Sequence, residues 1–311
     1  MCLIKTIYKK LLIHRYDKDG IIPYLSASDF PGLLCEERTF VNSRDVNIHY
    51  YFYNYADYKK DKLILFLPGI GPGHTAYIAE INALCSRGYK VLTLDYMGCD
   101  KSEGESSISF NEPTRDVDDL LNYLNIEKNL IVVGHSLGGY TGLNIINLKH
   151  SITKAIIISG FLSIELQLQQ WTKSNFLRKR ILSIERKADD KYFGIDNLNY
   201  LRNTTDKLLF IQSNDDQVVS FANSLKIVRE IHNPNIQTIE EAGKKHNPNY
   251  KLEAVNYMNE VFGTYNYLVK HRKLKTLEEK QKYMEDKSAL RMTEQDEKII
   301  SRIIEFIEEG N

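Results

Sequence analysis

Short, continuously apolar segments recur along the chain and are separated by segments with helical spacing. The apolar segments are KLILFLP (62–68), YKVLTLDY (89–96), NLIVVG (129–134), KAIIIS (154–159) and KLLFIQS (207–213). A strand that is apolar on both faces is typical of a parallel sheet covered on both sides. The alternation therefore predicts an α/β fold with a mostly parallel central β-sheet and helices on both faces.

The sequence pattern divides the chain into an N-terminal part and one large domain. Residues 1–36 hold an amphipathic helix and a lead-in, and residues 37–311 form the α/β domain. Two stretches interrupt the alternation. We expect residues 161–206 to form a small helical lid insertion, and residues 249–292 to form a charged helical insertion before the last core helix. That last helix carries an apolar face that predicts packing on the core, made of Ile299, Ile300, Ile303, Ile304 and Ile307.

The N-terminal segment MCLIKTIYKKLLIH carries lysines inside its apolar stripe. Lys5, Lys9 and Lys10 break the uninterrupted apolar run that a secretory signal needs. No stretch reaches the roughly 18 apolar residues of a membrane span, so we expect no integral membrane segment. An amphipathic helix of this kind either docks on the domain or contacts a membrane surface or a partner. Peripheral membrane contact and a homo-oligomer are both compatible with it.

The charge and cysteine content bear on the binding partners and the cellular compartment of the protein. Lys and Arg together number 41, as do Asp and Glu, so the chain has no net basic field that would hold nucleic acid or an anionic membrane nonspecifically. The four cysteines form no CxxC pair and no metal-ligand spacing. Isolated thiols favour a reducing compartment, and we expect a cytoplasmic protein.

The sequence GHSLGG carries the strongest chemical signal. Residues 134–138 match G-x-S-x-G and lie directly between an apolar strand and a helical segment. A serine in this position, Ser136, sits on a strained turn with its hydroxyl exposed. The alternative is a serine that only caps the helix. His135 is its neighbour on a sharp turn, where adjacent side chains point apart, so we interpret His135 as a packing residue.

A serine hydroxyl is a good nucleophile only beside a base that a third group orients. His246 follows the last predicted strand in a glycine-containing loop, from which a side chain can reach the carboxyl edge of a parallel sheet. His74, beside a glycine-rich turn, is the rival base. Asp215 and Asp216 both follow the strand 207–213 and are candidates for the acid, although Asn-Asp-Asp is also ordinary turn chemistry.

The glycine-rich turn PGIGPG (68–73) follows the first buried strand. Such turns present backbone N–H groups to an anion. A dinucleotide fingerprint would need a third glycine at the position of His74, and Asp95 meets only the further requirement for an acid after the next strand. The turn therefore fits a transient anion better than a bound phosphate. A nucleotide-binding module is the alternative from another class.

Several stretches together resemble the α/β-hydrolase superfamily, over residues 37–309. LFLPGIGP resembles the strand and oxyanion turn of that family, YKVLTLDYMGCDKSEG its next strand and loop, and GHSLGG its nucleophile elbow. IQSNDDQVVS resembles its acid loop and GKKHNP its histidine loop. The order serine, aspartate, histidine is also the order of the family. Three residues depart from the pattern, because Pro68 replaces a histidine, Asp100 a glycine and Ser220 a proline.

The resemblance implies an acyl-transfer reaction without a metal or an organic cofactor. The serine would attack a carbonyl carbon, the histidine would take its proton, and backbone N–H groups would bind the oxyanion. The spacing of the family's acid loop favours Asp216, with Asp215 as the alternative. The residues assigned to these roles are the catalytic Ser136, Asp216 and His246 and the oxyanion-binding Ile70 and Leu137.

The lid segment offers an apolar surface for the acyl part of a substrate, although helical spacing there is also typical of plain packing. The residues that we expect to contact substrate are Phe161, Leu162, Leu166 and Trp171. The resemblance favours a serine hydrolase of small carboxylic esters with an apolar acyl group, similar to monoacylglycerol lipases and with acyl-ester or lysophospholipid-like substrates. The alternatives are a serine aminopeptidase or other acyl-transfer hydrolase, and a non-catalytic ligand-binding protein of the same fold.

Overall fold

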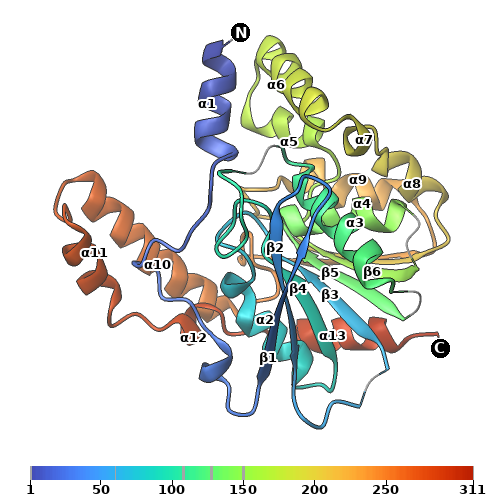
Figure 1. Ribbon diagram of the computed structural model, residues 1–311, viewed down its shortest axis with the longest axis horizontal. Coiled ribbons are helices and arrows are strands. Elements are labelled where there is room, and N and C mark those ends of the chain that lie inside the picture. Colours follow the sequence, from blue (N-terminus) through green and yellow to red (C-terminus); the bar gives the residue numbers. More distant parts are fainter. Residues whose placement is uncertain (1, 60, 107–108, 127–128, 149–150, 311) are drawn as a thin grey trace.

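An eight-stranded sheet runs through the centre of the molecule (Figure 1). The computed structural model describes residues 2–59, 61–106, 109–126, 129–148 and 151–310. In sheet order the strands are β1 (Leu34–Val41), β2 (Asn47–Asn54), β4 (Lys90–Leu94), β3 (Leu63–Leu67), β5 (Leu130–His135), β6 (Ile152–Ile158), β7 (Lys207–Ser213) and β8 (Ile236–Glu241). Strand β2 is antiparallel to both of its neighbours, and the pairs from β4 to β8 are parallel. The predicted mostly parallel α/β sheet is confirmed.

Helices connect and flank the strands. The first four are α1 (Cys2–Leu12), α2 (Ile78–Cys85), α3 (Glu112–Leu124) and α4 (Leu137–Asn147). The predicted lid contains α5 (Ile164–Trp171), α6 (Asn175–Ala188), α7 (Asp190–Phe193) and α8 (Asn197–Asn203). The others are α9 (Leu225–Ile231), α10 (Leu252–Lys270), α11 (Leu277–Met284), α12 (Ala289–Met292) and α13 (Glu297–Glu308). Among the helices that are described, none combines the length and the apolar character needed to cross a bilayer.

Side chains of the central strands alternate between two apolar cores, one on each face of the sheet. In β3, Ile64 and Phe66 lie in the core that contains α2 and α13. Leu65 and Leu67 lie in the core that contains α3, α4 and α9. Successive side chains of a strand point to opposite faces, so a strand covered on both sides is apolar at every position. The continuous apolar runs of the sequence reflect this double burial.

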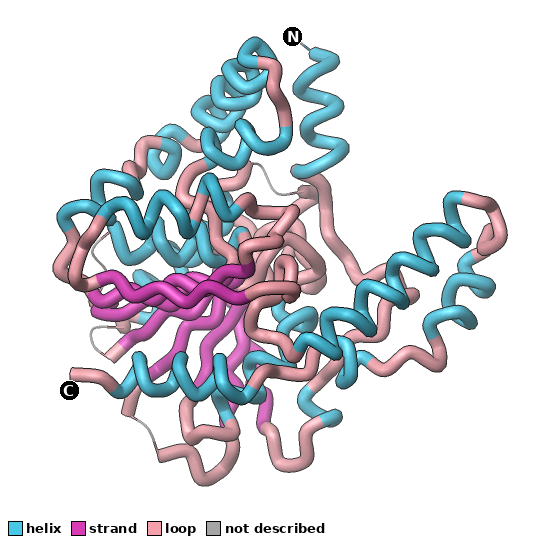
Figure 2. Tube along the Cα trace, turned by 180° about the vertical axis from the view of Figure 1, so that it is seen from behind, coloured by secondary structure: helices cyan, strands magenta, loops and turns pink. Residues whose placement is uncertain are grey.

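The helices that follow β6 form a cap, and α1 packs beside it; α1 and α6 lie next to each other in both views (Figures 1 and 2). The hydroxyl of Tyr8 in α1 donates a hydrogen bond to Oε1 of Glu185 in α6 (2.6 Å), and the Phe110 N–H donates to Oε2 of the same carboxyl group (2.9 Å). Tyr8 and Ile181 share one buried cluster with Leu137 at the start of α4. The N-terminal helix is therefore anchored on the cap through a buried polar contact.

Helices α10 and α11, in the predicted insertion 249–292, project from the body as an arm (Figures 1 and 2). A small buried cluster of Val261, Met284 and Met292 joins α10, α11 and α12. The side chain of Gln281 donates a hydrogen bond to the carbonyl of Gly20 (3.1 Å), which links the arm to the segment after α1. The arm therefore has a core of its own, separate from the two cores of the sheet.

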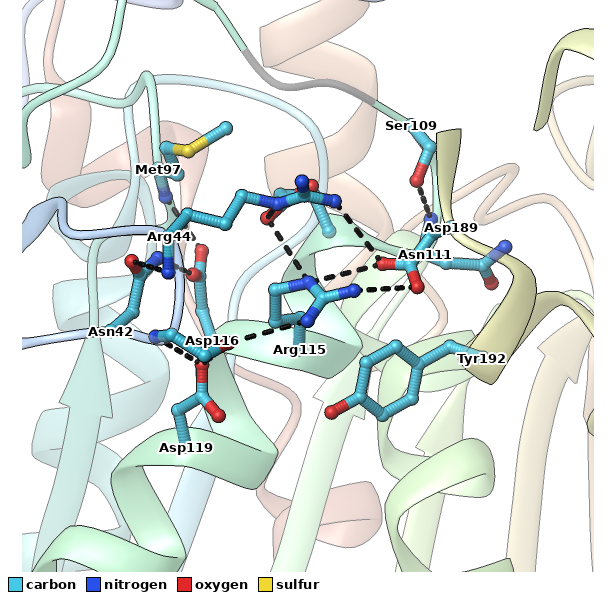
Figure 3. A network of polar contacts seen from close by, with 12 residues as sticks. Asn42, Arg44, Met97, Ser109, Asn111, Arg115, Asp116, Asp119, Asp189 and Tyr192 are labelled. Atoms are coloured by element: carbon cyan, nitrogen blue, oxygen red, sulfur yellow. Dashed lines mark hydrogen bonds and ion pairs between the residues drawn. The ribbon is translucent and has the colours of Figure 1, made fainter. Parts of the chain in front are cut away.

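A network of charged side chains joins the β1–β2 turn, α3 and the cap (Figure 3). Arg44 donates from Nε to Oε1 of Glu112 (2.7 Å). Arg115 donates from Nε and Nη2 to the two carboxylate oxygens of Asp189 at the end of α6 (3.2 and 2.7 Å). Both carboxyl groups are fully buried, and buried charges are tolerated when they are paired and hydrogen-bonded. The two arginines thereby tie the cap to the sheet domain.

The carboxyl group of Glu185, which holds α1 on the cap, has a raised pKa. Burial above all, together with the neighbouring Asp189 and Glu112, raises the pKa of its carboxyl group to about 7, against the lowering effect of the hydrogen bonds from Tyr8 and Phe110. Because this pKa is higher in the folded chain than in the unfolded chain, its contribution to stability is present at low pH and is lost as the pH rises towards 7.

The Glu185→Gln variant tests this assignment. A glutamine can still accept from the Phe110 N–H and can donate to the Tyr8 oxygen, but it does not titrate. We expect the variant to gain stability relative to the wild type between about pH 4.5 and pH 7, by on the order of 3 kcal/mol. Urea unfolding at several pH values measures this difference. Glu165→Gln, at an exposed position in α5, is the control. An equal pH slope in wild type and Glu185→Gln would contradict the assignment.

Candidate active site

Ser136 occupies a sharp turn between β5 and α4. Its backbone has φ 57° and ψ −117°, a conformation that non-glycine residues adopt rarely and at a cost. The Ser136 N–H donates to the Ile158 carbonyl of β6 (2.9 Å), and the Ser136 carbonyl accepts from the Tyr140 N–H (3.1 Å). Hydrogen bonds on both sides therefore hold the strained residue in place, as expected for a nucleophile elbow.

Close packing of α4 against the sheet depends on Gly138. A Cβ atom at this position would overlap the carbonyl oxygen of Leu67 at the end of β3 and would crowd that of Pro68. Only glycine therefore allows the first turn of α4 to approach the end of β3. This approach brings the glycine-rich turn after β3 close to Ser136, and a Cβ on Gly69 would lie 3.1 Å from the Ser136 Cβ.

Asp216 and His246 meet at the carboxyl ends of the neighbouring parallel strands β7 and β8. The His246 Nδ1–H donates to Oδ2 of Asp216 (2.9 Å). The other oxygen of Asp216 accepts from the backbone N–H groups of Val218 (2.8 Å) and Val219 (3.0 Å). The Asp216 side chain is fully buried and that of His246 is 17% exposed. The carboxylate is thus fixed by its own loop and presents one oxygen to the ring.

The rival candidates have other partners. Asp215 accepts from the Ser213 hydroxyl (2.6 Å) and from the Lys245 N–H (3.2 Å), and so stabilises the two loops. His74 is buried, where its Nδ1–H donates to Asp95 (2.7 Å) and its Nε2 accepts from Tyr53 (3.0 Å). The structure therefore brings Asp216 to His246, and it places Asp215 and His74 in separate contacts.

His135 connects the turn that carries Ser136 to the loop that carries His246. Its Nε2–H donates to the backbone carbonyl of His246 (2.8 Å), and the two rings lie 4.8 Å apart. Among the described residues, no hydrogen bond joins the Ser136 hydroxyl to His246. Catalytic hydrogen bonds often tighten only when substrate binds. Burial, and then the nearby His246, lower the pKa of His135 to about 3, so His135 remains neutral at physiological pH.

Tyr77 extends this connection to the glycine-rich turn. Because Nε2 of His135 carries the proton, its Nδ1 accepts, and the donor is the Tyr77 hydroxyl (3.0 Å). The oxygen of that hydroxyl accepts in turn from the Gly69 N–H (3.0 Å). A continuous chain of hydrogen bonds therefore runs from Gly69 through Tyr77 and His135 to the backbone of His246. This arrangement fits the expectation that His135 is a packing residue and adds a polar function to it.

A small apolar cavity of about 30 Å³ lies beside the turn. Both residues with the predicted oxyanion-binding N–H groups, Ile70 and Leu137, line it. Within the described part of the chain, neither of these N–H groups has a hydrogen-bond acceptor. The backbone N–H of another lining residue, Met97, donates to Asp116 in α3 (2.7 Å), in the network of Figure 3. The charged network therefore also fixes one wall of the cavity.

The other walls come from residues that sequence reasoning did not single out, namely Tyr16, Tyr96, Cys99, Ser109, Phe110 and Pro113. Two of the predicted substrate contacts, Phe161 and Trp171, pack against Phe110 (ring centroids 6.4 and 5.7 Å apart) and so lie behind this wall. The other two, Leu162 and Leu166, pack with the core on the α3 and α4 face of the sheet. None of the four lines the cavity itself.

Side-chain amides of α5 hold the loop that carries Asp216. Gln167 donates to the carbonyl of Val218 (2.8 Å), and Gln170 accepts from the N–H of Ser220 (2.7 Å). A proline at the position of Ser220, as in the family pattern, would have no N–H for this bond. Asp100, which replaces a family glycine, has φ 40°, in the left-handed region that favours glycine. Both departures are therefore accommodated without loss of a polar group at the site.

Comparisons with known proteins agree with the topology. Residues 62–190 match the sequence model of a family described as alpha/beta hydrolase fold. An esterase from Pyrococcus furiosus is similar in structure, with a TM-score of 0.57 and 17% identity over 75% of this chain and 89% of its own. The alpha/beta hydrolase domain-containing protein 10 from mouse gives a TM-score of 0.53 and 20% identity over 68% and 90% of the two chains.

An esterase from Rhodococcus sp. also resembles the chain, with a TM-score of 0.51 and 16% identity over 68% of this chain and 91% of its own. No curated protein sequence matches the chain. Among the described residues, no group of three or more His, Cys, Asp or Glu side chains is arranged to hold a metal ion. The strand order, the single antiparallel strand β2 and the family match agree. The chain therefore has the α/β-hydrolase fold.

Proposed function

We propose that the chain is a serine hydrolase that cleaves carboxylic esters through an acyl-enzyme intermediate. One observation carries the proposal: Asp216 pairs with the His246 ring at 2.9 Å, at the sheet edge where the strained turn presents Ser136. Nucleophile, base and acid thus come from the ends of three strands of one parallel sheet. The esterases among the structural relatives support the choice of ester chemistry.

The proposed reaction begins with attack of the Ser136 oxygen on the carbonyl carbon. His246 takes the hydroxyl proton, and Asp216 holds the ring so that Nδ1 keeps its own proton and the imidazolium is stabilised. The N–H groups of Ile70 and Leu137 bind the oxyanion, each contributing roughly 3 kcal/mol to transition-state stabilisation. His246 then returns the proton to the leaving alcohol and activates water for deacylation.

The apolar walls of the small cavity indicate where the acyl group lies. Tyr96, Met97 and Phe110 surround it together with Leu137. A cavity of about 30 Å³ is far smaller than a usual ligand pocket of roughly 300 Å³ or more. A short apolar acyl group therefore fits best as the site stands, and a longer group requires Phe110 and the cap behind it to move.

The cytoplasm is the proposed compartment, because Cys35, Cys85 and Cys99 are free thiols.

Hydrolysis of p-nitrophenyl esters from acetate to octanoate, beside a matching p-nitroanilide, tests the proposal. We expect the wild type to cleave the esters at least about 100-fold faster than the anilide, and Ser136→Ala to lose about 10³-fold or more of kcat. Faster anilide cleavage would favour the aminopeptidase alternative. Unchanged turnover by Ser136→Ala would contradict the proposal, and no turnover by folded wild type would favour the non-catalytic alternative.

Tyr77→Phe tests the hydrogen-bond chain that positions the oxyanion turn. The variant leaves the Gly69 N–H and His135 Nδ1 without their shared partner. We expect kcat for the best ester to fall about 10- to 100-fold with little change in KM, because the Ile70 N–H is then held less well in the transition state. Tyr55→Phe, which removes only a hydrogen bond to Asn82, is the matched control. Equal kcat values in both variants would overturn the positioning role.

A further inference from the structure

The charges of the chain are balanced overall but not in space. The stretches 2–12 and 172–188, which contain α1 and α6, have nine basic residues: Lys5, Lys9, Lys10, Lys173, Arg178, Lys179, Arg180, Arg186 and Lys187. Their single acidic residue, Glu185, is buried and faces Tyr8. Within the described residues, none of the nine forms an ion pair, and all but the half-buried Arg178 are exposed. The exposed side chains of these two stretches are therefore strongly positive.

An apolar hollow of about 270 Å³ lies between these two helices. Ile4, Phe176 and Ile184 contribute its apolar surface, and Lys5, Lys9, Arg180 and Lys187 surround it. The Phe176 ring is 63% exposed, and the Arg180 guanidinium lies 5.3 Å from its centroid. Exposed aromatic and aliphatic side chains ringed by basic groups are typical of a surface that enters the headgroup region of a bilayer.

The position of the α1 and α6 surface supports a functional connection between this surface and the candidate active site. Helices α1 and α6 stand next to each other beyond the body of the molecule, on the side away from α13 (Figures 1 and 2). Tyr8 of α1 and Phe110 of the cavity wall belong to the same buried cluster as Leu137. This cluster and the buried carboxyl group of Glu185 therefore lie between the hollow and the candidate active site.

We infer that the face formed by α1 and α6 binds the surface of membranes that contain anionic phospholipids. The basic side chains pair with lipid phosphates, and Phe176 enters the interface between headgroups and acyl chains. Charge complementarity selects the anionic membrane, because a neutral bilayer would leave the unpaired basic groups without partners. The exposed aliphatic side chains Ile4 and Ile184 distinguish the surface from one that binds double-stranded nucleic acid, where basic groups follow the phosphate backbone.

Binding to vesicles tests the inference in the full-length chain. We expect the protein to sediment with phosphatidylcholine vesicles that contain about 30% phosphatidylglycerol and to stay in solution with pure phosphatidylcholine. Raising the salt from about 0.1 M to 0.5 M should release it. The Ser136→Ala variant should bind like the wild type, which separates this result from the proposed hydrolase activity.

Charge reversal localises the surface. The combined variant with Lys5, Lys9, Arg180 and Lys187 changed to Glu should bind on the order of 100-fold more weakly. The same number of reversals elsewhere, at the exposed Lys226, Lys270, Lys282 and Lys298, should change binding less than about threefold.

Phe176→Ala is the variant least able to disturb the fold, because its ring is mostly exposed, and it should weaken binding about tenfold without altering the salt dependence. Thermal unfolding verifies that each variant is folded. Equal binding by the two reversal variants would overturn the inference. So would equal sedimentation with neutral and anionic vesicles, or tighter binding to single-stranded RNA or polyglutamate than to anionic vesicles.

Discussion

Ser136 holds a left-handed backbone conformation between the last residue of β5 and the first of α4. Such a conformation costs roughly 1–3 kcal/mol and persists only where the surroundings over-determine it. Here β6 accepts the Ser136 N–H, the first turn of α4 donates to its carbonyl, and Gly138 lets that turn meet the end of β3. Three neighbouring strands and one helix therefore fix the direction of a single hydroxyl.

The rest of the site is arranged around this turn. The parallel order of β5, β7 and β8 brings the loops after these strands to one edge, where Asp216 pairs with His246. His135 and Tyr77 link the histidine loop to the glycine-rich turn through neutral hydrogen bonds. The charged network in Figure 3 acts at greater distance, because it fixes the cap and one cavity wall. Polar contacts thus position groups that apolar packing alone would leave free to shift.

Local sequence patterns could predict the elements whose structure depends mainly on neighbouring residues in the chain. Continuous apolar runs predicted the buried strands, and the motif around Ser136 predicted the turn between β5 and α4, since both depend on neighbours in the chain. The cavity walls were missed because Tyr16 and Phe110 lie in irregular segments whose positions depend on distant contacts. The sequence analysis did not single out Glu112, which is fully buried, or Arg115, which is half-buried, because their partners Arg44 and Asp189 come from distant segments. Likewise, no local sequence pattern predicts that α10 and α11 project from the body of the molecule.

The reactivity of Ser136 towards a fluorophosphonate tests the central claim, that Asp216 and His246 activate this serine. Peptide mass spectrometry of the treated wild type should place the adduct on Ser136, and Asp216→Asn should slow its formation about 10³-fold or more. Asp215→Asn, which makes the same chemical change at the adjacent residue, should label at nearly the wild-type rate. An adduct on another residue, or equal slowing by the two substitutions, would contradict the account.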